Sequence, residues 1–166
     1  MLWVKTFFGI LFQTLLLGIF LYLPAFTLNW SDAFLLLTIH FLMTILASAY
    51  LLIVKPESIE ARMNYDSKTQ PKEDRLATAL MFSAIIVGLS LAPIDIFHLN
   101  LSSSFNGNIK NIGLGLYIFG MLLVMASMNA NEFAETTVNI QEERGQKVID
   151  TGIYSLVRHP MYTGFI

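Results

Sequence analysis

The chain has 166 residues, of which 55% are hydrophobic and only 13% charged, and its formal net charge is −2. A soluble domain normally carries about a quarter charged residues, so this composition predicts an integral membrane protein. The nearly balanced charge offers no basic stripe, and no nucleic-acid partner is expected. The absence of cysteine excludes disulfides, thiol nucleophiles and thiolate metal sites.

Four apolar stretches are long enough, or nearly so, to cross a bilayer as helices. They cover residues 7–28, 33–54, 76–94 and 111–130. The first is too long for the apolar part of a signal peptide and no cleavage site follows it, so an uncleaved transmembrane helix is predicted. The predicted fold class is therefore all-α membrane, with polytopic transmembrane helices that make up residues 1–130.

The connections between these helices differ in length and charge. Residues 29–32 alone join the first two helices, which predicts a tight antiparallel hairpin with a helix cap from Ser31 or Asp32. Residues 55–75 hold five basic and five acidic side chains and no apolar run, so a water-exposed loop is expected there. The third helix is expected to end near Pro93 and to be followed by a loop.

The distribution of Lys and Arg predicts the orientation of the chain. If the N-terminus is cytoplasmic, nine of the ten basic residues lie inside and only Lys110 lies outside. Such a bias is typical of cytoplasmic loops. The N-terminus and the residues after 130 are therefore expected to face the cytoplasm, where small-molecule cofactors are available.

Residues 131–166 have a different composition and are expected to form a cytoplasmic cofactor-binding segment and the start of a fifth helix. Two β-leaning runs around a charged, glycine-containing turn predict a small hairpin over 136–149. Residues 150–152 then turn the chain, and Pro160 suits the first turn of a new helix. The apolar run 164–166 has no stop signal behind it, so the chain is expected to be a fragment of a longer protein.

Three polar side chains gather where this last helix begins. Arg158 offers a planar set of donors for a carboxylate or phosphate, His159 can donate, accept or titrate near neutral pH, and Tyr162 supplies a phenol. With the N–H groups after Pro160 they suit a small anionic or zwitterionic molecule. Alternatively, Arg158 extends to lipid phosphates, His159 caps a neighbouring element and Tyr162 is an interfacial aromatic residue. The residue types alone leave both interpretations open.

The same region carries a family resemblance. Residues 152–164 read G-x-Y-x-x-V-R-H-P-x-Y-x-G, and the run 131–151 ahead of them ends in QEERGQKVIDT. Together they resemble the isoprenylcysteine carboxyl methyltransferase family, which is part of a wider group of integral-membrane methyltransferases that includes phospholipid N-methyltransferases. The number and polarity of the preceding helices agree with that group.

The resemblance implies transfer of a methyl group from S-adenosylmethionine to a lipophilic small molecule or lipidated group that enters from the membrane lipids. It implies a cytoplasm-facing cofactor pocket, covered by the 136–149 hairpin. Catalytic roles fall on Arg158 and His159, with Arg158 on the cofactor carboxylate. The residues implied in cofactor binding are Arg158, His159, Pro160 and Tyr162, with Gly152, Tyr154 and Gly164 shaping the backbone.

The chain departs from the family pattern in two places. Ile153 stands where the family commonly has proline, which loosens the turn and removes no functional group. The downstream half of the family, with a glutamate-bearing stretch expected to help hold the cofactor, is absent. A carboxylate acceptor needs no general base, whereas an amine or thiol acceptor needs one, for which His159 is the candidate.

Other functions remain as alternatives. A membrane reductase that uses a nicotinamide cofactor has a somewhat similar cytoplasmic end, and a non-catalytic membrane scaffold needs no pocket. A transporter is disfavoured because His40 is nearly the only ionisable group within the spans. A packing role is favoured for His40, and Asp95 with His98 supplies too few ligands to predict a metal site. The methyl acceptor and the oligomeric state are not determined by the sequence.

Overall fold

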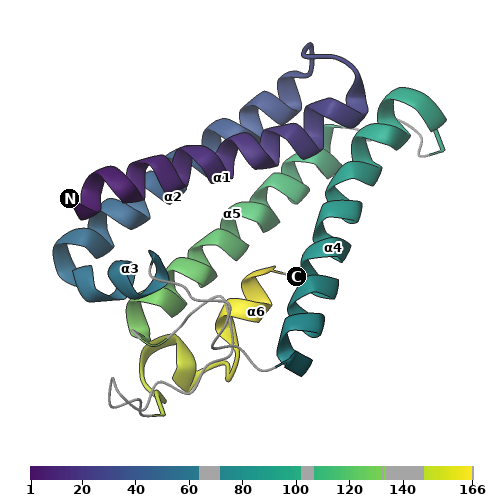
Figure 1. Cartoon of the computed structure of the whole chain (residues 1–166). Helices are drawn as coiled ribbons and strands as arrows, with labels where there is room; N and C mark the ends of the chain where they lie inside the picture. Colours follow the sequence, from purple (N-terminus) through teal and green to yellow (C-terminus); the bar gives the residue numbers. More distant parts are fainter. Residues whose placement is uncertain (64–71, 102–106, 132, 134–147, 166) are drawn as a thin grey trace. The chain divides into compact units, whose positions relative to one another are not determined.

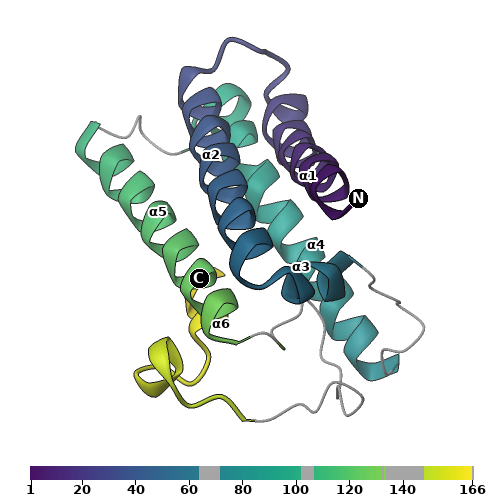
Figure 2. The same ribbon diagram turned by 90° about the vertical axis from the view of Figure 1, so that its left-hand side faces the viewer.

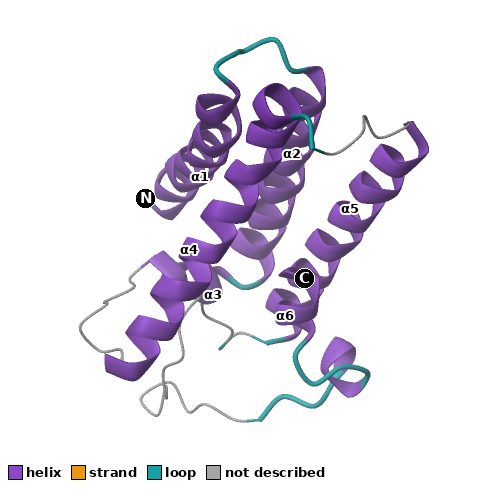
Figure 3. Cartoon of the chain, turned by 90° about the vertical axis from the view of Figure 1, so that its right-hand side faces the viewer, coloured by secondary structure: helices purple, strands orange, loops and turns teal. Residues whose placement is uncertain are grey.

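The computed structural model describes residues 1–63, 72–101, 107–131, 133 and 148–165 (Figure 1). All regular structure in these ranges is helical, with no strand among them (Figure 3). Four of the helical segments are long and apolar enough to cross a membrane, namely Leu2–Ala25, Ser31–Val54, Arg75–Leu99 and Gly107–Ala130. The predicted all-α membrane fold is confirmed for the described part of the chain.

The long helices begin before the apolar runs that predicted them, and three of them end at the predicted residue. Helix α1 (Leu2–Ala25) begins five residues before the predicted start, and α4 (Lys72–Ile94) begins four residues early. Each spans charged residues at its N-terminal end, such as Lys5 in α1. A helix of the 24 residues of α1 is about 36 Å long, more than the roughly 30 Å hydrocarbon core, so its ends continue into the polar interface.

The chain divides into two compact units. The first comprises Met1–Leu46 and Pro71–Lys110, and the second comprises Ala47–Gln70 and Asn111–Ile166. Helix α2 (Ser31–Val54) therefore begins in the first unit and ends in the second, and α5 (Gly107–Ala130) does the same. The predicted boundary at residue 130, between a transmembrane region and a cytoplasmic segment, concerns function and stays a prediction.

In the first unit, α1 packs against α4, and a short connection joins α1 to the start of α2 (Figure 1). Helix α1 continues through Pro24 and ends at Phe26, whose left-handed φ of 52° stops the helix. The turn into α2 is held by Tyr22, whose hydroxyl donates to the Trp30 carbonyl at 3.1 Å. Asp32, in the first turn of α2, pairs with Lys110 at 2.6 Å.

The expected loop after Pro93 is wrong for residues 95–99. Helix α4 runs through Pro93 and continues as the π-helical turn η1 (Asp95–Leu99), which ends at Asn100 with a left-handed φ of 51°. Proline lacks an N–H and clashes with the carbonyl four residues earlier, but a membrane helix tolerates this through local π-type adjustments. The helical structure therefore continues beyond a residue that usually breaks soluble helices.

The expected loop over 55–75 is also wrong in part, because α3 (Pro56–Met63) lies within it. Pro56 occupies the first helical position, Glu57 lies in the first turn and Arg62 in the last, all favourable for a short helix. Ser58 and Ile59 are buried, so this charged segment is amphipathic rather than uniformly solvated.

Candidate functional site

The second unit ends in a short helix that begins where the sequence predicts it. Helix α6 (Pro160–Phe165) starts at Pro160, whose side chain is fully buried. The His159 carbonyl accepts the Thr163 N–H at 3.1 Å and also the Thr163 hydroxyl at 3.1 Å. Arg158 and His159 are therefore the last two residues before the first helical position, on a backbone that the proline ring and these hydrogen bonds hold in place.

His159 and Tyr162 lie together on the same side of this helix start. Their ring centroids are 5.9 Å apart and the ring planes are inclined by 37°. Both residues are exposed, with Tyr162 at 52% of its full accessible surface. In the described part of the chain neither side chain makes a hydrogen bond. The structure thus brings together two of the predicted site residues as an open aromatic pair.

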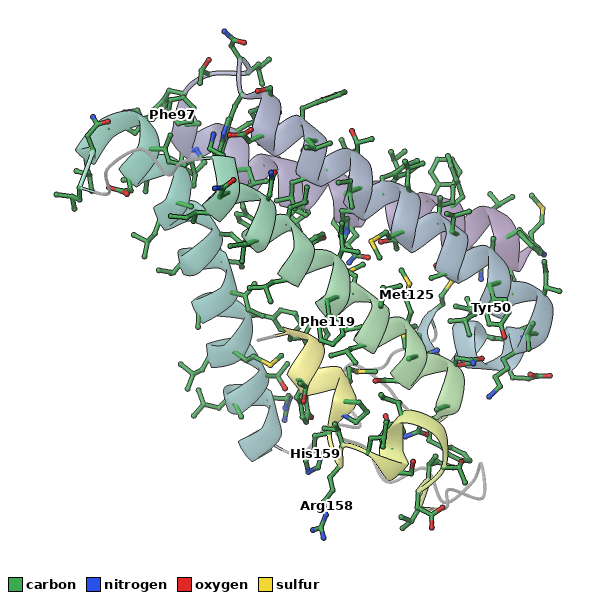
Figure 4. All side chains as sticks on the ribbon, turned by 180° about the vertical axis from the view of Figure 1, so that it is seen from behind. Tyr50, Phe97, Phe119, Met125, Arg158 and His159 are labelled. Carbon is green, nitrogen blue, oxygen red and sulfur yellow. The ribbon has the colours of Figure 1, made fainter. Side chains whose placement is uncertain are left out.

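Arg158 is exposed and projects away from the ribbon, as Figure 4 shows. Its guanidinium makes no hydrogen bond or ion pair with any residue that the structure describes. Its donors are therefore open to a ligand, but they do not point at the His159–Tyr162 pair. The structure therefore does not enclose Arg158, His159 and Tyr162 in one pocket among the described residues, and their joint role as a site stays a prediction.

The turn that leads into this segment requires a glycine. Gly152 has a φ of +61°, a conformation that costs other residues about 1–2 kcal/mol. It opens the 3₁₀ turn η3 (Gly152–Ser155), in which the Ser155 hydroxyl donates to the Gly152 carbonyl at 2.7 Å. A Cβ on Gly152 would meet the Ala130 Cβ at 3.5 Å, so this turn contacts the last residue of α5. Tyr154 is half-buried in it.

The end of α5 is fixed by polar contacts that the sequence did not predict. The Lys55 ammonium donates to the Asn129 carbonyl at 2.5 Å, where the helix leaves carbonyl groups without partners. The Asn131 side chain then accepts the Phe133 N–H at 2.9 Å, and Phe133 is buried. A lysine directly after an apolar helix is a recognisable capping candidate, but its partner lies 74 positions away in the chain.

Helices α5 and α6 meet at two glycines. A Cβ on Gly120 would lie 2.5 Å from the Gly164 carbonyl oxygen, and a Cβ on Gly164 would lie 2.6 Å from the Gly120 carbonyl oxygen. Figures 1 and 2 both show α6 beside α5. Gly164 is a predicted site residue, whereas Gly120 was not. The presence of glycine within a membrane span was the available signal, because small residues let helix backbones approach closely.

The other histidines take structural positions. The His98 ring contacts the Pro24 carbonyl through Nε2 at 2.8 Å, and the Asp95 carboxylate accepts the Leu101 N–H at 2.8 Å. In the described ranges no three His, Cys, Asp or Glu side chains lie close enough to hold a metal ion. His40 is buried within α2. Most of the predicted 136–149 hairpin, residues 136–147, lies outside the described residues.

Comparison with known proteins supports one family relationship. The family model described as phospholipid methyltransferase matches residues 109–166, about a third of the chain, from the first turn of α5 to the end of the sequence. Neither the curated proteins nor the solved structures gave a match. The family match supports an integral-membrane methyltransferase acting on a lipid-like substrate. It does not confirm the isoprenylcysteine carboxyl methyltransferase family specifically.

Proposed function

We propose that this chain transfers a methyl group from S-adenosylmethionine to a lipophilic acceptor at the cytoplasmic membrane face. The observation that carries the proposal is the open set of polar groups at Arg158, His159 and Tyr162. This set lies inside the region matched by the phospholipid methyltransferase family. It follows directly on a turn that is anchored to the end of a membrane-spanning helix.

The residues present suit S-adenosylmethionine in their chemistry. The donor's amino-acid end is a carboxylate, and the Arg158 guanidinium is a bidentate carboxylate donor with no described partner. The donor also carries a cationic sulfonium and an adenine, both of which aromatic rings attract, and the His159–Tyr162 pair is exposed. We assign Arg158, His159, Pro160 and Tyr162 to cofactor binding, with Gly152, Tyr154 and Gly164 setting the backbone.

When bound, S-adenosylmethionine supplies an electrophilic methyl group. In an in-line methyl transfer, the protein orients the two substrates and excludes water. The reaction needs no covalent intermediate. Arg158 orients the donor through its carboxylate. His159 accepts a proton at a ring nitrogen when the acceptor is an amine.

A phospholipid-like amine is the acceptor class that the family match favours, and an isoprenylcysteine-like carboxylate is the other candidate. Large apolar side chains of α5 are exposed along its length, among them Leu116, Phe119 and Leu122. Such side chains occur on the other long helices as well, and we place the lipid substrate beside α5 because the family match begins there, while a soluble donor approaches from water. The two substrates meet at the interface, next to the start of α6.

Calorimetric titration of the purified full-length protein with S-adenosylhomocysteine tests the cofactor assignment. Charge-assisted hydrogen bonds contribute about 1.5–3 kcal/mol, so Arg158→Ala is expected to weaken binding about 10- to 100-fold. Arg75→Ala is the matched control, since Arg75 is an exposed arginine in α4, away from the site sequence. Equal affinity in wild type and Arg158→Ala contradicts the role of Arg158. Binding of a reduced nicotinamide cofactor instead favours the reductase alternative.

The same preparation, placed in sealed vesicles of known orientation, tests the membrane face. The donor is charged and does not cross lipid, so methylation is expected only when it is added on the cytoplasmic side. Methylation from the opposite side alone overturns the proposed orientation. Methylation from neither side, with no binding by calorimetry, leaves the scaffold alternative.

A further inference from the structure

The crossing of α5 and α6 at Gly120 and Gly164 is a contact of backbone with backbone. Gly120 would carry its Cβ 2.5 Å from the Gly164 oxygen and 3.5 Å from the Gly164 carbonyl carbon. In return, a Gly164 Cβ would meet the Gly120 oxygen at 2.6 Å, and Val124 and Leu123 at 2.9 and 3.2 Å. Each Cα hydrogen thus faces the other residue's carbonyl oxygen, an arrangement that recurs at close helix contacts.

A side chain at either position has no room. Real Cβ atoms stay well beyond 3.0 Å from such neighbours, and the obstructing atoms at Gly120 belong to the backbone, which cannot rotate aside. A methyl group there pushes the two helices apart by several tenths of an ångström or more. Elsewhere on α5 the situation is the opposite, because a Cβ on Gly113 or Gly115 meets nothing within 4 Å.

Displacement of α6 moves the candidate site. Gly164 is only two residues beyond Tyr162 and four beyond Pro160, within a helix of six residues. A helix this short moves as a unit, so the His159–Tyr162 pair follows any shift of Gly164. A misplacement of about 1 Å in a binding segment can lower a rate about 100-fold even when the changed residue touches no substrate.

We propose that Gly120 is a positioning residue, which holds the segment from His159 to Tyr162 in its binding geometry by admitting Gly164 against α5. The proposal rests on the proposed function, because it assigns Gly120 a role in that same site. Gly120 touches no cofactor or substrate and acts through Gly164. The alternative is that this glycine serves folding alone.

Titration with S-adenosylhomocysteine separates these roles. Gly120→Ala is expected to raise the dissociation constant about tenfold or more, with the binding stoichiometry unchanged. A glycine needed for folding alone lowers the stoichiometry, because fewer molecules fold, and leaves the dissociation constant as it was. Gly115→Ala is the matched control on the same helix and should bind like wild type. Unchanged affinity in Gly120→Ala overturns the proposal.

Gly164→Ala provides a second variant in case Gly120→Ala does not fold, and the same loss of affinity is expected from it. Folding of each variant is checked by its elution as a single species in detergent. Wild-type affinity in a folded Gly164→Ala protein contradicts the proposal as directly as it would for Gly120.

A measurement that needs no cofactor distinguishes failure of this proposal from failure of the proposed function. The chain has no cysteine, so spin labels attach only at introduced ones, Leu116→Cys on α5 and Thr163→Cys on α6. Gly120→Ala is expected to weaken the dipolar coupling between the labels, and Gly115→Ala to leave it unchanged. If wild type binds no S-adenosylhomocysteine, the proposed function fails. Whether or not the wild type binds, an unchanged dipolar coupling in Gly120→Ala refutes the positioning role of Gly120.

Discussion

His98 in the first unit and His159 in the second place the same side chain in contrasting surroundings. The His98 ring nitrogen contacts the Pro24 carbonyl at 2.8 Å, at the end of α1, and the ring lies edge-on to Phe26. The His159 ring pairs with Tyr162 and has no hydrogen-bond partner among the described residues.

Two cations, one in each unit, differ in the same way. Lys110 in the first unit pairs with Asp32, whereas Arg158 in the second has no described partner. Polar residues beside hydrocarbon are costly when nothing satisfies them. His98 and Lys110 therefore stabilise the packing of helices, whereas Arg158 and His159 are the groups that we propose bind a ligand.

The largest expected effect concerns His159. With phosphatidylethanolamine as the acceptor, His159→Gln is expected to lower the methylation rate about 100-fold, because a positioned general base contributes about that much. Initial rates with labelled S-adenosylmethionine measure it. His98→Gln is the matched control and should keep the wild-type rate. A His159→Gln enzyme with full activity on an amine acceptor shows that this ring is not the general base.

The next effect concerns His98 and appears in stability. His98→Ala should lower the free energy of unfolding in detergent by about 1 kcal/mol, since it removes a helix-end hydrogen bond and an aromatic contact. His98→Phe keeps a ring near Phe26 and should lose only part of this unfolding free energy. Thermal unfolding followed by circular dichroism measures both. Loss of cofactor binding in His98→Ala would break the contrast between the two histidines.

The smallest effect concerns the ion pair of Lys110 and Asp32, whose side chains are each 52% exposed. Pairs this exposed contribute between about 0 and 1 kcal/mol, so Lys110→Met should change stability within that range. The difference should shrink in high salt, which screens exposed charges. Unfolding at low and high ionic strength tests this. A larger or salt-independent loss shows that Lys110 has a further structural role.

Hydropathy alone predicted the long helices because a bilayer requires uninterrupted apolar runs. It placed the C-terminal ends of α2, α4 and α5 correctly and missed the starts of all four long helices, because these starts include polar or charged residues. It also missed α3, because this charged segment contains no apolar run. The start of α6 at Pro160 was predicted correctly from proline chemistry. These successes and failures all concern local structure.

The candidate site was less accessible to prediction. Its residues were identified from a short local pattern, and their roles stay predictions. Gly120 was missed because its importance depends on Gly164, 44 positions later, and only the folded chain brings the two together. The same holds for Lys55 and the end of α5. Local patterns show which residues are unusual, and tertiary contacts show what each unusual residue does.

The spacing along α5 has a consequence of its own. The helix touches α6 at Gly120 and the η3 turn at Ala130, ten residues later. One inserted or deleted residue between them rotates one contact against the other by about 100° and shifts it by about 1.5 Å. The number of residues between Gly120 and Ala130, and the helical angle between them, are therefore constrained more tightly than the identity of most side chains in this part of α5.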